Sequence, residues 1–115
     1  MMEVKSLILA VDDEPDICRL MKRVLESVGY QVITASDGNQ VLELVAERNP
    51  DLVLLDILMP GKSGMEVFQE LKISHPDTGV IMATAVVDAN VAIDTLREGA
   101  LDYLIKPFSV NELVI

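Results

Sequence analysis

The sequence has few aromatic residues, with two Phe, two Tyr and no Trp among 115 residues. Half of all residues are nevertheless hydrophobic, so aliphatic side chains must fill the interior. A chain of this length buries about two thirds of the surface that it exposes when unfolded. We therefore expect residues 1–115 to form a single domain with an aliphatic core.

Cysteine is almost missing as well, since Cys18 is the single one. One thiol cannot form an intramolecular disulfide or supply a cysteine metal cluster. Because helical positions flank Cys18, we interpret it as a small core or boundary residue rather than a nucleophile.

Basic residues are scarce: nine Lys and Arg stand against nineteen Asp and Glu, and the formal net charge is −10. A surface of this sign repels phosphate backbones and anionic lipids, which argues against direct binding to nucleic acids or membranes. Apolar stretches such as LILAV and VIMATAVV fall far short of the roughly 20 residues of a membrane span. The first apolar run leads straight into acids, unlike a signal peptide. We expect a cytoplasmic protein.

Short apolar runs alternate with segments of helical period, which is typical of βαβ units around a parallel sheet. The pattern predicts a doubly wound, five-stranded parallel sheet with helices on both faces. The expected strands are residues 6–11, 31–35, 52–56, 80–84 and 102–106.

Four complete helices are expected between these strands. Gly29 is a stop signal for the first helix, and Asp37 and Asp88 are N-cap candidates for the second and fourth. A fifth helix opens at Ser109, but the pattern stops after one turn, so we expect it to be truncated and any output domain to lie beyond residue 115. The expected buried positions are Ile17, Met21, Val24, Leu25 and Val28 in the first helix, Val41, Leu42 and Val45 in the second, Gly64, Phe68 and Leu71 in the third, and Ala92, Leu96 and Ala100 in the fourth.

Polar side chains stand at the ends of four predicted strands. Asp12 and Asp13 follow the first strand, and Asp56, Thr84 and Lys106 end the third, fourth and fifth. Because functional groups collect at the carboxyl ends of the strands in such sheets, we expect these side chains to share one rim.

Three carboxylates at a partly buried rim, Asp12, Asp13 and Asp56, repel one another unless a cation is present. Mg²⁺ takes a few carboxylate or carbonyl oxygens and leaves room for phosphate oxygens. Lys106 would add a positive charge and Thr84 a hydroxyl donor. Such a set suits phosphoryl transfer, with Asp56 as a nucleophile that forms an acyl phosphate.

Four motifs together resemble those of a response-regulator receiver domain of two-component signalling: VDDE (11–14), DILMPGKSG (56–64), ATA (83–85) and DYLIKPF (102–108). They stand in the family's order and spacing, and the resemblance runs from about Lys5 to the end of the chain. It implies a flavodoxin-like sheet with strand order 2-1-3-4-5. It also implies a phosphorylation-dependent switch that catalyses only its own phosphorylation and slow dephosphorylation, and is not otherwise an enzyme.

The resemblance implies roles for the rim residues. Asp56 would accept the phosphoryl group of a sensor histidine kinase or phosphotransfer protein, and Lys106 would contact that group. Asp13, Asp56 and the backbone carbonyl of Leu58 would bind Mg²⁺ or Mn²⁺. Asp12 would hold the ion mainly through water.

Thr84 and Tyr103 would form the conformational switch that acts on an output domain or partner protein. Many receivers also form homodimers when activated.

Plainer interpretations exist for these residues and others. Thr84 can be an ordinary β-branched strand residue, and Tyr103 a core residue with its hydroxyl at the surface. Asp12 and Asp13 can be acids that favour the start of a helix, which is all we expect of Glu14.

Three other classes fit parts of the pattern. A haloacid-dehalogenase-like phosphatase would need an Asp as general acid where Leu58 stands. A flavodoxin relative would need a first loop rich in Ser, Thr and Gly, whereas this loop reads DDEPD. A receiver that has lost phosphorylation and only binds partners would not need the complete set of site residues.

Two apolar positions bear on the lifetime of the phosphorylated form. Leu58 and Val86 each stand two residues after a site residue, where polar side chains of many relatives orient or shield the attacking water. Neither can hydrogen-bond to that water. We predict a phosphorylated form that lives longer than that of a fast chemotaxis receiver.

Overall fold

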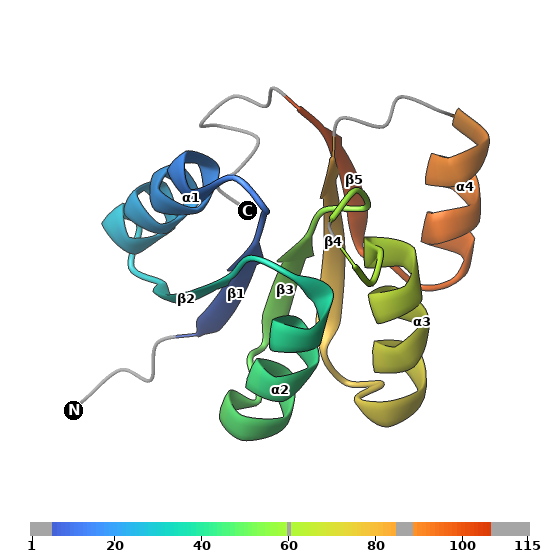
Figure 1. The fold of residues 1–115 in the computed structure, drawn as a ribbon, viewed down its shortest axis with the longest axis horizontal. Helices are drawn as coiled ribbons and strands as arrows, with labels where there is room; N and C mark the ends of the chain where they lie inside the picture. Colours follow the sequence, from blue (N-terminus) through green and yellow to red (C-terminus); the bar gives the residue numbers. More distant parts are fainter. Residues whose placement is uncertain (1–5, 60, 85–88, 107–115) are drawn as a thin grey trace.

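The computed structural model describes residues 6–59, 61–84 and 89–106. The predicted alternation of strands and helices is confirmed in these ranges, while Asp88 and the expected fifth helix lie outside them (Figure 1). No helix in the described part of the chain is long and apolar enough for a membrane span. The elements are β1 (Leu7–Val11), α1 (Pro15–Ser27), β2 (Gln31–Ala35), α2 (Gly38–Arg48), β3 (Leu52–Leu55), α3 (Gly64–Ser74), β4 (Gly79–Thr84), α4 (Ala89–Arg97) and β5 (Asp102–Ile105).

All five strands are parallel, and their order is β2-β1-β3-β4-β5, as the resemblance implies. The register brings the carboxyl ends of neighbouring strands together: Val11 pairs with Ala35, and Thr84 pairs with Ile105. The residues that follow β1, β3 and β5 therefore emerge along one edge of the sheet.

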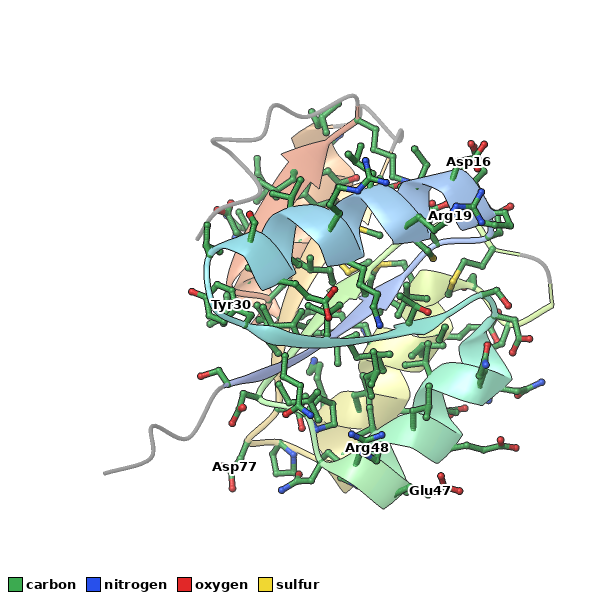
Figure 2. The ribbon with its side chains drawn as sticks, turned by 90° about the vertical axis from the view of Figure 1, so that its left-hand side faces the viewer. Asp16, Arg19, Tyr30, Glu47, Arg48 and Asp77 are labelled. Carbon is green, nitrogen blue, oxygen red and sulfur yellow. The ribbon has the colours of Figure 1, made fainter. Side chains whose placement is uncertain are left out.

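Apart from Phe68, the buried core is aliphatic, as expected, and it has two layers. One face of the sheet, with Leu9 and Leu55, packs against α2 and α3. The other face, with Ile8 and Leu54, packs against Met21 and Leu25 of α1. Figure 2 shows α1 lying across this second face, with the exposed pair Asp16 and Arg19 near its first turn. Because successive side chains of a strand point to opposite faces, a strand covered on both sides must be apolar throughout.

Short polar side chains fix the starts of two helices. Asp37 is the N-cap of α2, as predicted, and its Oδ1 accepts a hydrogen bond from the amide of Gln40 at 2.9 Å. Ser63 is the N-cap of α3, and its Oγ accepts from the amide of Glu66 at 3.3 Å. Each cap satisfies a backbone donor that the helix cannot pair internally.

The predicted buried face of α4 was partly wrong. Leu96 is 43% exposed, and Thr95 is the fully buried residue instead. The hydroxyl of Thr95 donates to the backbone oxygen of Val91 at 2.6 Å, so this side chain can be buried without an unpaired polar group. Hydrophobicity alone predicts that Leu is buried in preference to Thr, and it therefore assigns the wrong residue to the buried face.

Two helices end earlier than the apolar spacing predicted. Ala100 is buried, but it lies beyond α4, after a turn at Gly99 with a φ of +113°. Val28 follows the last residue of α1 and is 48% exposed. In both cases glycine in the left-handed region ends the helix, and the apolar residue beside it no longer shares the helical face.

Candidate functional site

The predicted rim residues meet at the carboxyl edge of the sheet. Asp12, Asp56 and Lys106 each lie directly after a strand, and Thr84 is the last residue of β4. Asp56 and Lys106 were predicted as strand residues, so the strands end one residue earlier than expected. Asp12 and Thr84 are fully buried and Asp56 is 5% exposed. Such burial is unusual for carboxylates and points to a dedicated arrangement of partners.

Three carboxylates form a compact cluster at this rim. One oxygen from each of Asp12, Asp13 and Asp56 lies within 4.8 Å of the others. Asp12 and Asp56 are buried, whereas Asp13 is exposed, so the cluster is closed on one side and open to solvent on the other. Oxygen ligands in this arrangement fit a hard divalent cation that keeps several waters, as Mg²⁺ does.

Lys106 is the positive counterpart of the two buried carboxylates. Its Nζ donates to Oδ2 of Asp12 and to Oδ2 of Asp56, the latter at 2.8 Å. Burial alone would lower the pKa of Lys106, but the hydrogen bonds and charges of Asp12 and Asp56 outweigh it and raise the pKa above its usual value. The ammonium therefore stays charged at ordinary pH and offsets part of the negative charge of the cluster.

Asp12 and Asp56 are held in the same way at their other oxygen. Oδ1 of Asp12 accepts from the amide of Glu14 at 2.9 Å, and Oδ1 of Asp56 accepts from the amide of Leu58 at 3.1 Å. Each carboxylate therefore caps its own loop with one oxygen and binds Lys106 with the other. No buried side-chain nitrogen or oxygen in the described ranges lacks a hydrogen-bond partner.

Packing of the backbone accounts for the last glycine of the motif DILMPGKSG, Gly64. It is the first residue of α3, and its amide donates to the backbone oxygen of Ile57 at 2.9 Å. A Cβ atom on Gly64 would lie only 1.9 Å from the backbone oxygen of Asp56. Only glycine therefore allows α3 to start directly against the peptide of Asp56.

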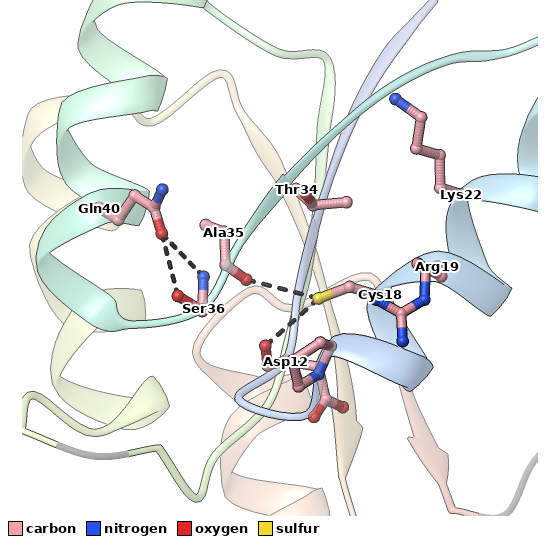
Figure 3. Close-up of a pocket in the computed structure, with 9 residues that line it drawn as sticks. Asp12, Cys18, Arg19, Lys22, Thr34, Ala35, Ser36 and Gln40 are labelled. Atoms are coloured by element: carbon pink, nitrogen blue, oxygen red, sulfur yellow. Dashed lines mark hydrogen bonds between the residues drawn. The ribbon is translucent and has the colours of Figure 1, made fainter.

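Cys18 lies beside the site, on a cavity of about 260 Å³ between α1 and the end of β2 (Figure 3). Its Sγ lies 3.3 Å from the backbone oxygen of Asp12 and 3.7 Å from that of Ala35. Burial raises the pKa of this thiol. The interpretation of Cys18 as a small buried residue is confirmed, whereas its contact with Asp12 left no signal in the sequence.

The remaining predicted residues lie at or near this edge. Leu58 is 62% exposed, and its amide binds Asp56. Tyr103 is half-buried in β5, pairs in register with Met82 and packs against the core on the α2 and α3 side. Val86 lies outside the described residues.

The fold and the rim are those of a doubly wound α/β protein with an acidic site at the carboxyl ends of its strands. A family model described as "Response regulator receiver domain" matches residues 8–115. The chain belongs to this family, and it is a receiver domain of the type found in two-component response regulators.

Relatives in sequence are regulators of transcription. The chain is 44% identical over 112 residues to "Probable transcriptional regulator ycf27" of Guillardia theta. This alignment covers 97% of this chain and 44% of that protein. It is 37% identical over 110 residues to "DNA-binding transcriptional regulator NtrC" of Salmonella typhimurium, and that alignment covers 96% of this chain and 24% of that protein. The chain thus spans less than half the length of these relatives.

Solved structures agree in fold. The receiver domain of NtrX from Brucella abortus superposes with a TM-score of 0.86 at 36% identity, over 92% of this chain and 90% of that one. The chemotaxis protein CheY4 of Vibrio cholerae gives a TM-score of 0.88 at 28% identity, over 96% of this chain and 93% of that one.

Proposed function

We propose that this receiver domain is a phosphorylation switch whose phosphoacceptor is Asp56. The arrangement of that carboxylate supports the assignment: Leu58 holds one oxygen, Lys106 binds the other, and Asp12 and Asp13 lie alongside. In the proposed reaction a carboxylate oxygen of Asp56 attacks phosphorus, and the bond from phosphorus to the imidazole nitrogen of the donor breaks. The products are an acyl phosphate and the free imidazole of a histidine kinase or phosphotransfer protein.

We assign the acidic cluster to Mg²⁺ or Mn²⁺. Asp13, Asp56 and the backbone carbonyl of Leu58 would be direct ligands, and Asp12 would act mainly through water. The ion, when bound, neutralises charge on the phosphoryl oxygens. Lys106 already reaches Asp56, and it would pass from the carboxylate to a phosphoryl oxygen, where its positive charge stabilises the developing negative charge.

The same proposal extends to signal output. Thr84 and Tyr103 would report the charge change at Asp56, because Thr84 ends the strand beside β5 and Tyr103 lies on β5 itself. The longer relatives are transcriptional regulators, which supports an output domain or protein partner, with homodimerisation as one route to activation. With a net charge of −10, this chain would not itself bind nucleic acid or membranes. We place it in the cytoplasm, as a protein that catalyses only its own phosphorylation and dephosphorylation.

Intact mass spectrometry tests the phosphoacceptor. After incubation with Mg²⁺ and acetyl phosphate, wild-type protein should gain one phosphoryl group and Asp56→Ala none. The exposed Asp77→Asn is the matched control, and it should gain the group like wild type. If wild type stays unmodified, or if Asp56→Ala is modified equally, Asp56 is not the phosphoacceptor.

A further inference from the structure

The first turn of α2 lies directly against the loop that follows Asp56 (Figure 1). Gly38, the first residue of α2, is buried. A Cβ atom on Gly38 would lie 2.8 Å from the backbone oxygen of Lys62 and 2.8 Å from Cγ2 of Val67. Real Cβ atoms essentially never come within 3.0 Å of such neighbours, so α2 and the loop are as close as glycine allows.

Space, and not backbone conformation, accounts for glycine at position 38. The glycines with positive φ in the described ranges are Gly29, Gly61 and Gly99, and Gly38 is not among them. Alanine would be the better helix former at such a position. The advantage that glycine offers here is the missing methyl group, which lets Lys62 approach.

Two contacts therefore hold the loop. Gly64, which follows the loop, joins its two ends: it packs against the backbone of Asp56 and donates to Ile57. Near its end, Lys62 packs against Gly38. The loop includes Leu58, whose amide holds the carboxylate of Asp56.

We propose that Gly38 is a positioning residue for the phosphorylation loop. By contact with Lys62, it fixes where the loop places Leu58 and the carboxylate of Asp56 relative to Asp12 and Asp13. This inference rests on the proposed function of Asp56 as phosphoacceptor. It adds that the start of α2, which contributes no ligand, sets the affinity of the site for its cation.

The substitution Gly38→Ala tests this role. The added methyl must push Lys62 or α2 away by several tenths of an ångström. We expect the dissociation constant for Mg²⁺ to rise about three- to tenfold and phosphorylation by acetyl phosphate at low Mg²⁺ to slow by a similar factor. The backbone amide NMR signals of Leu58, Lys62 and Gly64 should shift, while the far-ultraviolet circular dichroism should not change.

Asn39→Ala is the matched control. Asn39 is the next residue of the same helical turn and is exposed, and its substitution by alanine also raises helix propensity, by somewhat less than substitution of a glycine does. It should bind Mg²⁺ and accept phosphate like wild type. Equal effects of Asn39→Ala and Gly38→Ala would assign the change to helix propensity and overturn the proposal.

A measurement on wild type covers the case in which Gly38→Ala does not fold. Because Lys62 and Leu58 lie in the same loop, we expect Mg²⁺ binding at the cluster to move Lys62 slightly against Gly38 and to shift the amide signal of Gly38. The signal of Gly99, at the end of α4, is the internal reference. No shift of Gly38 on Mg²⁺ binding overturns the positioning role.

The outcomes separate this inference from the proposed function. If wild type takes up neither Mg²⁺ nor phosphate, the proposed function fails, and the contact is judged by the amide signals of Lys62 and Gly64 in Gly38→Ala. If wild type is phosphorylated and Gly38→Ala matches it in Mg²⁺ affinity, rate and amide signals, the positioning role is wrong and Asp56 keeps its assignment.

Discussion

At the carboxyl edge of the sheet, Asp12 and Asp56 are buried and bind the half-buried Lys106, whereas at the amino edge Asp51 is exposed and binds the backbone of Leu7. Asp51 and Leu7 exchange two hydrogen bonds: the amide of Asp51 donates to the oxygen of Leu7, and Oδ2 of Asp51 accepts from the amide of Leu7, both at 2.8 Å. Asp51 thus joins the starts of β1 and β3.

The two edges therefore use carboxylates for different purposes. The amino edge uses one exposed carboxylate to satisfy a backbone donor, which stabilises the fold. The carboxyl edge gathers three carboxylates, two of them buried, although like charges repel and burial costs free energy. Substitutions of carboxylates at the two edges should then have opposite consequences: at the amino edge a loss of stability, and at the carboxyl edge a loss of cation binding.

The largest effect on stability is expected from Lys106→Met. The side chain of Lys106 is 17% exposed, and removing its charge leaves Asp12 and Asp56 buried without the ammonium group that pairs with them. In EDTA the free energy of unfolding, measured by urea denaturation, should fall by about 3 kcal/mol. Added Mg²⁺ should restore part of this loss, because it supplies positive charge to the same carboxylates.

The control for this substitution is Lys62→Met. Lys62 pairs with Glu70 at the surface, where the two side chains are 26% and 46% exposed. Its loss should change stability by about 0.5 kcal/mol or less. Similar small losses for both variants would contradict the view that Lys106 compensates a buried cluster.

Asp13→Asn should separate binding from stability. We expect at least about a tenfold loss of Mg²⁺ affinity by calorimetric titration, which corresponds to ~1.4 kcal/mol. In EDTA the variant should be as stable as wild type or more stable by a few tenths of a kcal/mol, because one of three like charges is gone. Asp16→Asn, an exposed acid in the first turn of α1, should leave Mg²⁺ affinity unchanged. A loss of stability in Asp13→Asn would mean that the cluster is a structural feature.

Asp51→Ala should show the reverse behaviour at the amino edge. The amide of Leu7 loses its carboxylate partner, so the free energy of unfolding should fall by about 1 kcal/mol. The dissociation constant for Mg²⁺ should stay the same, since Asp51 lies at the other end of β3 from Asp56. Asp77→Ala, an exposed loop acid, controls for the change in net charge. A change of Mg²⁺ affinity in Asp51→Ala would show that the two edges are coupled.

The sequence was sufficient for the strands and for the rim. Runs that are apolar on both faces identify strands covered from both sides, and in such runs a carboxylate such as Asp56 has no role in packing. The parallel arrangement then places the carboxyl ends of all strands at one edge, so the topology predicts that Asp12, Asp13 and Lys106 lie close to Asp56.

Other features depend on contacts between segments that are distant in the chain. The close approaches of Gly38 to Lys62 and of Gly64 to Asp56 require the packed backbone, because a glycine in sequence does not reveal what occupies the space of its side chain. The two hydrogen bonds of Lys106 also depend on the packed structure. The sequence predicted a positive charge at the rim, but not that Lys106 binds both Asp12 and Asp56. The buried Thr95 was missed because its hydroxyl is satisfied within its own helix.

The smallest effect is expected at the exposed border of the carboxyl edge, where Leu58 holds Asp56 through its amide but turns a 62% exposed apolar side chain to solvent. Leu58→Asn keeps the backbone amide and adds a group that can hydrogen-bond to an attacking water. Decay of the radiolabelled phosphorylated protein should then become a few-fold faster, a change of under about 1 kcal/mol in the barrier. Leu58→Met, which has a similar volume and no strong hydrogen-bonding group, should decay like wild type. If wild type itself loses its label within seconds, the apolar side chain does not protect the acyl phosphate, and stability of the phosphorylated form must be sought elsewhere on the rim.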